Sequence, residues 1–392
     1  MDIKQIAEQI ADEVISLRRD LHKIAELSFE EYKTAAYVAE YLEGLGLSCR
    51  RNVAKTGVIA YLDAGCGHTL LLRADMDALP VTEWHGVSYR SETEGVMHAC
   101  GHDAHMAVLL AAAKCMTAHK DKLKTNILFL FQPGEETDGG AEPMIETGIL
   151  EEFHVTCAAG LHVMNDVEVG KIQVKAGDLM AAPDDFELTI YGKGGHGAYP
   201  HECIDPITLA ARIISDFDMI AARFTTPLSP KVISTCVVKS GNMYNVIPDT
   251  AYLSGTVRTF DKTLRETIPE MMNKAIKGVC DIADAKFEFQ FNFRYPPLIN
   301  HAGMAEALEK AVSKELGEDI VIKGSIPSMG GDDFAYFGEH VPAVYFFLGS
   351  GNKESGITMP LHSSDFRIDE SCLKTGVAAY LALAFNDCTY FG

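Results

Sequence analysis

The sequence is poor in positive charge and has no long apolar run. Its 392 residues include 34 Lys and Arg against 55 Asp and Glu, a formal net charge of −21. A surface this acidic does not suit a phosphate backbone, so we expect no nucleic-acid partner. No window approaches the roughly 18 apolar residues of a membrane span. Residues 1–20 mix charges into a helical pattern instead of forming a signal segment. We therefore expect a cytoplasmic protein without membrane contact.

The cysteines also lack a familiar pattern. Ten are scattered along the chain, with no Cys-x-x-Cys pair and no dense cluster. This argues against a disulfide scaffold and against a structural zinc ribbon. Most should be reduced, buried thiols, and Cys100 is the exception because of its neighbours.

The length and composition indicate an ordinary globular protein of two domains, with 47% hydrophobic and 23% charged residues. Helical and strand patterns alternate up to Pro183, change in style, and return after Pro296-Pro297. We therefore predict an α/β fold with a discontinuous first domain, residues 1–183 and 296–392, and an inserted α+β domain, residues 184–295.

Apolar periodicity predicts the individual elements. Strands of the first domain are expected at 58–62, 69–73, 126–131, 155–161, 320–323 and 343–348. Its helices are expected at 3–27, 30–45, 106–119, 142–147, 304–316 and 370–385. The inserted domain is expected to have strands at 185–191, 231–239, 251–260 and 286–291, with helices at 206–222 and 264–283.

Residues 97–105 place one thiol, three imidazoles and a carboxylate directly before the apolar run 106–113. Such crowding indicates either a metal site or a nucleophile, and the stretch alone does not decide between them.

Ligand-type side chains recur where the predicted strands end. They come from five segments: Asp75, Asp77, Cys100, His102, Glu135, Glu136, His162 and His362. Thiol, imidazole and carboxylate together suit zinc or another transition metal, whereas magnesium and calcium prefer oxygen ligands. Because the set exceeds the four ligands of one tetrahedral ion, two metal ions sharing a ligand are the simplest interpretation.

Each of these features has an ordinary explanation when taken alone. Paired glutamates after a strand are usually solvated, Asp75-x-Asp77 could cap a helix, and a single histidine such as His162 is more often a structural residue. The joint occurrence at strand ends favours a functional site. Glu135 and Glu136 cannot point the same way along an extended backbone, so we expect one to bind metal and the other to act as general base.

Eight motifs in this order carry a resemblance to a known family. They are RADMDALP (73–80), MHACGHDAH (97–105), FLFQPGEE (129–136), GLH (160–162), GKGGHGAYPH (192–201), NVIP (245–248), GTVR (255–258) and MGGDDF (329–334). The sequence resembles the M20 metallopeptidase family over nearly its whole length. Within it, the chain is similar to the amidohydrolase subfamily of hippurate hydrolases, IAA-amino acid (auxin-conjugate) hydrolases and N-acetyl-amino-acid deacetylases.

The resemblance implies a catalytic α/β domain with a central mixed sheet and a binuclear metal centre, and a smaller lid domain that also forms a homodimer. It implies that Glu135 activates water as the general base and that Asp77 orients a metal ligand. Asp75 stands where the wider family has a metal-binding histidine and is not assumed to bind metal. The implied metal ligands are Cys100, which would bridge the two ions, His102, Glu136, His162 and His362.

In the lid domain, His196 matches a histidine that reaches the partner subunit's active site and stabilises the oxyanion. Asn245 and Arg258 match residues that hold the substrate carboxylate. Dimer formation would then be part of catalysis. One departure from the subfamily pattern is Gly134, where alanine is commoner, and this could change how tightly the turn is held.

The expected activity is hydrolysis of the amide bond of a small N-acyl amino acid, with an acetyl, benzoyl or similar acyl group. The cofactors would be two divalent transition-metal ions, Zn, Mn, Co or Ni. One alternative is a dipeptidase or aminopeptidase of the same superfamily. A binding scaffold without activity is disfavoured, because Glu135 and all five ligand residues are present. In the stretch 97–105, Asp103 and His105 are expected to support the ligands or to begin the helix, and His98 has no assigned function.

Overall fold

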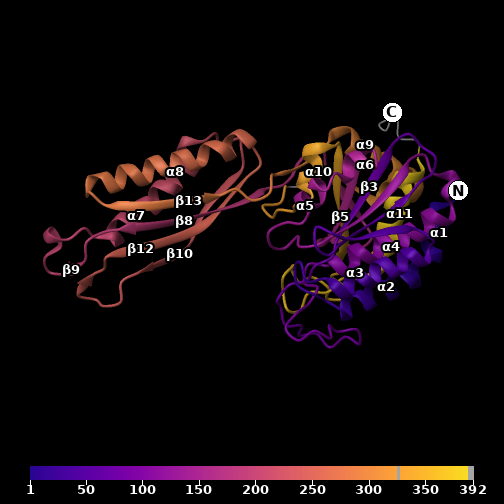
Figure 1. Ribbon diagram of the computed structural model, residues 1–392, viewed down its shortest axis with the longest axis horizontal. Helices are drawn as coiled ribbons and strands as arrows, with labels where there is room; N and C mark the ends of the chain where they lie inside the picture. Colours follow the sequence, from indigo (N-terminus) through magenta and orange to yellow (C-terminus); the bar gives the residue numbers. More distant parts are fainter. Residues whose placement is uncertain (325–326, 387–392) are drawn as a thin grey trace. The chain divides into compact units, whose positions relative to one another are not determined.

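The structure, a computed structural model, describes residues 1–324 and 327–386. The chain divides into two compact units (Figure 1). Unit 1 contains Met1–Leu179, Ile299–Ile326 and Asp333–Gly392, and unit 2 contains Met180–Leu298 and Pro327–Asp332. The domain boundaries predicted from the sequence differ from this division at residues 327–332, which they place in the first domain. The segment joins unit 2 because the backbone N–H of Ala181 donates to the carbonyls of Ser328 and Gly330, at 3.1 and 2.9 Å.

Unit 1 is built on an eight-stranded sheet with the strand order β1-β2-β4-β3-β5-β16-β6-β15. β3 runs parallel to β4 and β5, and β16 runs parallel to β5, whereas β1, β2 and β6 have antiparallel neighbours. The large mixed sheet expected from the sequence is therefore confirmed. The strands are β1 (Ser48–Val53), β2 (Gly57–Leu62), β3 (Thr69–Asp75), β4 (Asn126–Gln132), β5 (Val155–Glu168), β6 (Ile172–Val174), β15 (Val321–Lys323) and β16 (Ala343–Gly351). A separate two-stranded pair is formed by β7 (Gly177–Met180) and β14 (Leu298–Asn300).

Helices of unit 1 pack on this sheet, and one of them is buried along nearly its whole length. That helix, α4, begins directly after the stretch that carries the thiol and the imidazoles, and it contacts α2 and α11. It presents apolar residues on all sides, as expected of a helix enclosed by protein. The helices are α1 (Ile3–Gln9), α2 (Ala11–Lys23), α3 (Tyr32–Gly44), α4 (His102–Ala118), α5 (Ala141–Glu146), α6 (Ile149–Glu152), α9 (Ala302–Leu316), α10 (Ala335–His340) and α11 (Leu373–Phe385).

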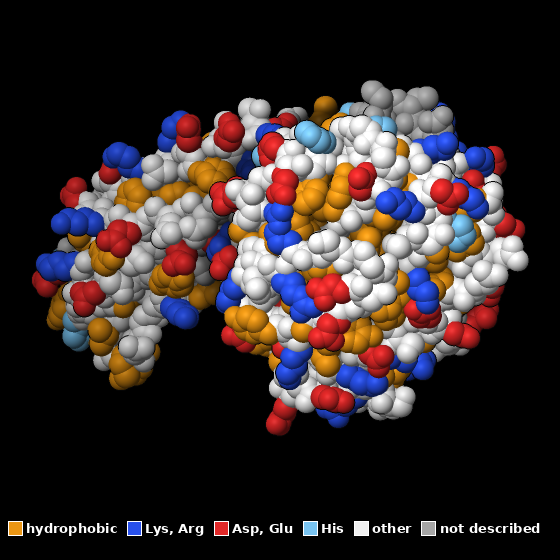
Figure 2. Space-filling view, turned by 45° about the vertical axis from the view of Figure 1, so that its right-hand side comes forward, with side chains coloured by type: hydrophobic (Ala, Val, Ile, Leu, Met, Phe, Trp, Pro, Cys, Tyr) orange, Lys and Arg blue, Asp and Glu red, His pale blue; other side chains and the backbone are white. Residues whose placement is uncertain are grey.

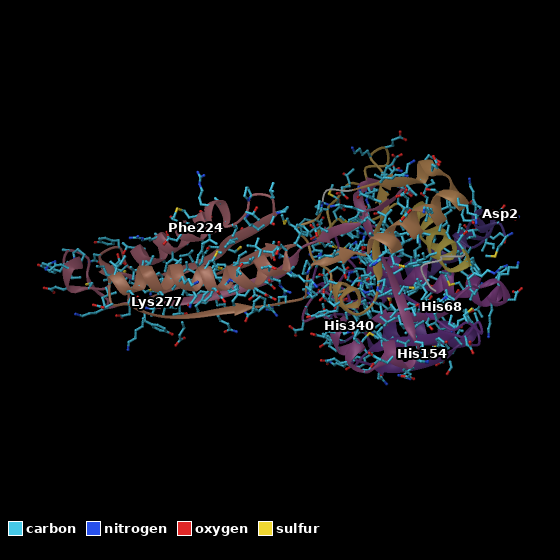
Figure 3. All side chains as sticks on the ribbon, turned by 90° about the horizontal axis from the view of Figure 1, so that it is seen from above. Asp2, His68, His154, Phe224, Lys277 and His340 are labelled. Carbon is cyan, nitrogen blue, oxygen red and sulfur yellow. The ribbon has the colours of Figure 1, made fainter. Side chains whose placement is uncertain are left out.

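Unit 2 contains a four-stranded antiparallel sheet of order β10-β12-β8-β13. Along β8, Phe186, Leu188 and Ile190 are buried and alternate with more exposed residues, so one face of the sheet packs into a core. Helices α7 and α8 cover that face (Figure 1), and Figure 3 labels Phe224, just after α7, and Lys277 on α8. The elements are β8 (Ala182–Tyr191), β10 (Lys231–Ser240), β12 (Thr250–Thr259), β13 (Lys286–Asn292), α7 (Pro206–Met219) and α8 (Lys262–Ile282).

The surface agrees with the mixed charge of the sequence. On the face shown in Figure 2, basic side chains are interspersed with acidic ones and with hydrophobic side chains. Among residues 1–324 and 327–386, no helix is long and apolar enough to cross a membrane.

Candidate metal centre and active site

The candidate site lies at the carboxyl ends of the central parallel strands of unit 1. β3 ends at Asp75 and β4 ends at Gln132, and these two residues are paired. Asp77 and the two glutamates therefore leave the sheet at the same edge, where open α/β sheets place their ligands.

His162 reaches this edge in a different way from the one predicted. The sequence predicted that its strand ends at Leu161, but β5 continues to Glu168 because it remains paired with β16 beyond His162. On its other side β5 pairs with β3 only as far as Gly160. His162 thus lies inside a strand, two residues past the last pairing with β3.

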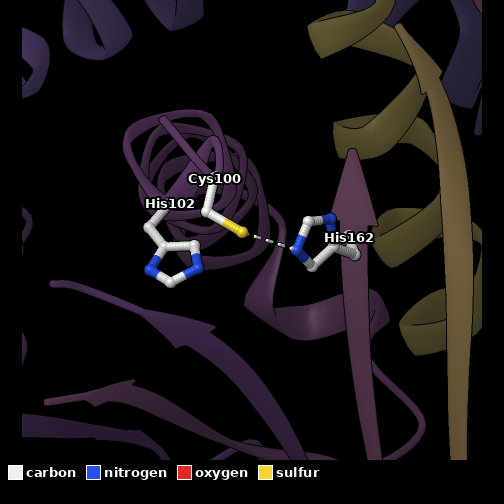
Figure 4. Close-up of side chains that lie close together, drawn as sticks. All are labelled: Cys100, His102 and His162. Atoms are coloured by element: carbon white, nitrogen blue, oxygen red, sulfur yellow. Dashed lines mark hydrogen bonds between the residues drawn. The ribbon is translucent and has the colours of Figure 1, made fainter. Parts of the chain in front are cut away.

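The segment before α4 brings a thiol and an imidazole together. Cys100 Sγ lies 3.4 Å from His162 Nε2 (Figure 4). Between Cys100 and His102 stands Gly101, which has φ +87°, and a Cβ there would lie 2.3 Å from Val163 Cγ2. Only glycine fits this turn without displacing its neighbours. Ligand atoms of Cys100, His102 and His162 all lie within 4.8 Å of one another.

The paired glutamates join the same cluster. Glu136 Oε1 lies 3.3 Å from His362 Nε2 and 3.9 Å from His102 Nε2. Glu135 is 6% exposed and groups with His102 and Glu136 within 4.8 Å. The sequence analysis predicted that the two carboxylates point apart, as they would on an extended backbone. Both residues instead lie in the turn after β4, which brings both carboxylates toward His102.

The donor atoms fit divalent metal ions. His102 Nε2 is buried and has no hydrogen-bond partner among the residues that the structure describes, and it faces Glu136 Oε1 at 3.9 Å. A buried polar atom without a partner is costly, and an imidazole nitrogen that faces a carboxylate oxygen at this distance suits a cation between them. The combination of thiol, imidazole and carboxylate matches transition metals.

The protonation of the cluster argues against a reactive thiolate at Cys100. Burial raises the pKa of the Cys100 thiol well above its ordinary value, and the charges of Glu136 and Glu135 raise it further. Burial lowers the pKa of His162, and the neighbouring His105 lowers it further. A neutral thiol therefore donates to a neutral imidazole, so the described residues do not activate Cys100 as a nucleophile, whereas a metal ion bound there would itself stabilise the thiolate.

Asp77 holds two parts of the cluster. Its Oδ1 lies 3.2 Å from His102 Nδ1, which leaves Nε2 of the same ring directed toward Glu136. Its Oδ2 accepts hydrogen bonds from Ser28 Oγ at 2.7 Å and from the backbone N–H of Glu136 at 3.0 Å. Burial lowers the pKa of His102, but the carboxylates of Asp75, Asp77 and Glu136 outweigh this effect and raise the pKa to about 10.

A second set of possible ligands, Asp75, His102 and His105, is also within 4.8 Å. Asp75 Oδ2, however, is paired with Arg73 NH1 at 2.7 Å, and Asp75 Oδ1 lies 2.6 Å from His105 Nδ1. His105 Nε2 accepts from the backbone N–H of Val163 at 3.0 Å. Both nitrogens of His105 are therefore already used.

Two carboxylates that the sequence did not single out support the turn that carries Glu135. Asp333 accepts from Arg73 NH2 at 2.8 Å, from Gln132 Nε2 at 2.7 Å and from the backbone N–H of Ala141 at 2.9 Å. Glu31 accepts from the backbone N–H of Gly134 at 2.9 Å. Asp333 belongs to the MGGDDF motif and could have been noticed there, whereas nothing in the sequence marks Glu31.

The start of α4 has a further buried support. Asp103 is paired with Arg18 Nε at 2.8 Å and with His22 Nδ1 at 2.7 Å, and all three side chains are buried. His22 had no assigned function in the sequence. The support of the helix start that was expected of Asp103 agrees with these contacts.

His362 is held through the backbone of its loop. Its N–H donates to the carbonyl of Ala99 at 2.8 Å, and its φ is +64°. Farther along, the carbonyl of Ser364 accepts from Trp84 N at 2.9 Å, and the carbonyl of Phe366 accepts from His85 Nε2 at 2.9 Å.

Two of the three candidate residues of unit 2 lie together. His196 in β9 (Gly195–His196) pairs with Val246 in β11 (Val246–Ile247), and Gly197 N donates to the carbonyl of Asn245 at 2.9 Å. The side chains of His196 and Asn245 are exposed. Arg258 lies apart from them on β12, where it pairs with Pro183 and Val232.

Three histidines without an assigned function lie at the other edge of the unit 1 sheet. His68 and His154 directly precede β3 and β5, and His340 lies shortly before β16. These are the amino ends of parallel strands, opposite to the end where β3 reaches Asp75; Figure 3 labels the three histidines.

Known proteins are similar to this chain over its full length. Thermostable carboxypeptidase 2 of Saccharolobus solfataricus is 38% identical over 389 residues, which cover 98% of each chain. The N-acyl-L-amino acid amidohydrolase of Geobacillus stearothermophilus is 42% identical over 302 residues, 76% of this chain and 81% of that one. The crystal structure of the Bacillus subtilis YXEP protein, described as a dinuclear metal binding peptidase from the M20 family, has a TM-score of 0.84 at 34% identity. That match covers 96% of this chain and 98% of the other.

A family model, described as peptidase family M20/M25/M40, matches residues 71–386. The matched span contains the strand ends, the start of α4, and His362. The resemblance that the eight motifs indicated is confirmed: the chain belongs to peptidase family M20/M25/M40, a family of amide-bond hydrolases.

Proposed function

We propose that this protein is a metal-dependent amidohydrolase that cleaves the amide bond of a small N-acyl amino acid. The observation that carries the proposal is the buried cluster of Cys100, His102 and His162, with Glu135 and Glu136 beside it. A buried general base next to a set of transition-metal ligands is the arrangement that hydrolysis of an unactivated amide needs.

In this proposal five side chains hold divalent metal ions, with zinc, manganese, cobalt and nickel as the candidates. Bound ions would polarise the amide carbonyl and make water in the site more acidic. The metal ligands are Cys100, His102, Glu136, His162 and His362.

The proton transfers fall to Glu135. Its carboxylate takes a proton from the attacking water and delivers it to the nitrogen of the departing amine. Asp77 does not touch the substrate: it keeps His102 Nε2 directed toward Glu136 and holds the backbone of Glu136. The pair of glutamates thereby keeps two distinct functions, one as proton carrier and one as ligand.

The substrate class follows from what two relatives have in common. An N-acyl-L-amino acid amidohydrolase and a carboxypeptidase, as their names state, both act on an amide whose nitrogen belongs to an amino acid with a free carboxylate. In unit 2 we assign His196 to the carbonyl oxygen, and Asn245 and Arg258 to the carboxylate, since a guanidinium fork suits that group. We further propose that unit 2 is the lid and forms the homodimer.

The test is the substitution Glu135→Gln in the metal-loaded enzyme, with a panel of acetyl-, benzoyl- and indole-acetyl-amino acids. Turnover should fall by about 10²- to 10⁴-fold, the usual contribution of a general base. Metal content measured by elemental analysis should stay at the wild-type level. The exposed Glu142→Gln is the matched control and should keep full activity. Chelation should abolish the activity of the wild type, and added metal should restore it.

Two results would contradict the proposal. Retained turnover in Glu135→Gln would remove Glu135 from the reaction. Cleavage of dipeptides with a free amino terminus, with no cleavage of acylated amino acids, would favour the dipeptidase or aminopeptidase alternative.

A further inference from the structure

A continuous line of buried hydrogen bonds runs from Arg73 to Cys100 and passes through two imidazole rings. We infer that His105 is a positioning residue that fixes the tautomer of His162, so that the Nε2 lone pair of His162 faces Cys100. The inference rests on the proposed function, in which His162 and Cys100 are metal ligands. His105 itself touches neither the metal nor the substrate in this assignment.

The backbone N–H of Val163 in β5 has no partner on β3. β3 pairs with β5 only as far as Gly160, while β5 continues past Val163. The Val163 N–H is buried, and a buried amide without an acceptor is costly. His105 Nε2 supplies that acceptor at 3.0 Å. This N–H belongs to the peptide group that joins His162 to Val163, so His105 holds the backbone that carries the His162 side chain.

The hydrogen bonds of its two ring nitrogens fix the tautomer of His105. An amide N–H can only donate, so His105 Nε2 must accept and the ring proton must be on Nδ1. His105 Nδ1 lies 2.6 Å from Asp75 Oδ1, which accepts that proton. The other oxygen of Asp75 is held by Arg73 NH1 at 2.7 Å. Both hydrogen bonds of the His105 ring therefore have a fixed donor and a fixed acceptor, and together they fix the orientation of the ring.

The carbonyl of Val163 fixes the tautomer of the candidate ligand His162. The Val163 carbonyl lies 2.7 Å from His162 Nδ1, and a carbonyl can only accept. His162 therefore has its proton on Nδ1, and the lone pair of its Nε2 faces Cys100 Sγ at 3.4 Å and accepts from the thiol (Figure 4). The hydrogen bond from its N–H to His105 thus holds Val163 in place. The carbonyl of Val163 in turn orients the His162 ring by accepting from Nδ1.

The same contacts decide between two functions for His105. Asp75, His102 and His105 are close enough to hold an ion by themselves. In that arrangement His105 would have to give up either Asp75 or the Val163 N–H. The structure instead uses both ring nitrogens for positioning, as is common for groups that stand behind metal-bound histidines.

The test compares His105→Ala, His105→Gln and the control His119→Gln in the full-length protein. A glutamine side chain keeps an acceptor near the position of Nε2, and alanine does not. His119 lies at the end of α4 opposite to His102, and its Nδ1 donates to the carbonyl of Cys115 at 3.0 Å. It therefore reports the cost of losing a hydrogen-bonded histidine away from the candidate ligands.

Zinc affinity is measured by competition with a chromogenic chelator, and the tautomers by ¹⁵N NMR of histidine-labelled, metal-free protein. His105→Ala should weaken zinc binding by about 10- to 100-fold, as for other residues that orient a ligand. It should also lower kcat with KM unchanged. His105→Gln should recover most of the affinity, and His119→Gln should bind zinc like the wild type. In the wild type, His162 and His105 should both carry their proton on Nδ1.

A His162 protonated on Nε2 in the wild type would overturn the inference, and so would wild-type zinc affinity in His105→Ala. Loss of bound zinc from His105→Gln at saturating zinc would make His105 a ligand instead. If His105→Ala does not fold, the tautomers in the wild-type NMR spectrum and the zinc affinity of His105→Gln still test the inference. The zinc affinity and the tautomers are measured without a substrate, so a wild type that binds zinc as described but cleaves no amide would contradict the proposed function alone.

Discussion

The candidate residues of the two units differ in how they are held. In unit 1, Cys100, His102, His162 and Glu135 are 7% exposed or less, and hydrogen bonds to second residues orient the rings. His362 is the exception, because its side chain is 54% exposed. In unit 2, His196 and Asn245 are exposed. A buried, oriented cluster can bind a metal ion by itself, because its geometry is already fixed before binding. Exposed side chains become ordered only when a substrate or another chain contacts them.

The largest effect expected from this difference is at Cys100. Cys100→Ala should lose zinc at limiting metal concentrations and reduce turnover to background, because it removes the thiol shared by two of the ligand groups. The matched control is Cys115→Ala, a buried cysteine in helix α4, which follows Cys100 in the sequence; this variant should keep both zinc and turnover. Elemental analysis and an amide hydrolysis assay give the two readouts.

The opposite outcome at Cys100 is equally clear. If alkylation of the thiol abolished turnover while all the metal stayed bound, Cys100 would be an attacking group. The buried cluster would then not be the metal centre, and the contrast between the two units would fail.

The intermediate effect is expected at His196 in unit 2. His196→Ala should lower kcat by about 10²- to 10³-fold, as for loss of one donor to an oxyanion. Its zinc content and Tm should equal those of the wild type, because the exposed side chain supports neither the cluster nor a core. A reduced zinc content would show that the two sets of residues are not independent.

Mixing two inactive variants tests whether His196 acts on the partner subunit. After subunit exchange between Glu135→Gln and His196→Ala, half of the dimers are mixed, and each mixed dimer has one complete site. Activity should therefore return to about one quarter of the wild-type value. If the mixture stays inactive although exchange is complete, His196 acts within its own chain or not at all.

The main strands, and the ligand-type side chains that lie together at the candidate site, could be predicted from the sequence because they depend on local patterns. β3 is a run of buried residues, and the ligand-type side chains recur at strand ends. β1 was missed because it is an edge strand whose exposed residues show no apolar alternation. The short elements β6 and α10 are too brief to produce a periodic signal. The helix predicted at 3–27 is broken at Ile10, with α1 and α2 on either side.

Residues that support the site could not be predicted, because their contacts are distant in sequence. His22 meets Asp103 across 81 positions, and Glu31 meets Gly134 across 103. A single histidine or glutamate in an amphipathic helix or loop looks the same whether it is solvated or buried against such a partner. The turn at Glu135 and Glu136 was misjudged for the same reason, since Glu31 and Asp77 hold its backbone from outside the local sequence.

The smallest effect is expected at Gly134, in the turn that precedes Glu135. Gly134 has φ +65°, and a Cβ there would lie 2.4 Å from the Phe29 ring. Gly134→Ala should cost about 1–2 kcal/mol for the left-handed backbone and more for the contact. It should lower Tm, and it should reduce kcat a few-fold by moving Glu135. Gly241→Ala in unit 2 is the control: it has φ +66° but no atom closer than 3.7 Å, so it should show the backbone cost without the loss of activity.

A double-mutant cycle with Phe29→Ala separates the cost of the contact with the Phe29 ring from the cost of the left-handed backbone. If the Phe29 ring is what restricts the turn, the combined variant Phe29→Ala, Gly134→Ala should be more stable than the sum of the two single changes predicts. Its kcat should also recover relative to Gly134→Ala. Strict additivity in both thermal unfolding and turnover would mean that the ring does not hold the turn. The fixed geometry of the buried cluster would then depend on Glu31 and Asp77, which bind the backbone of the same turn.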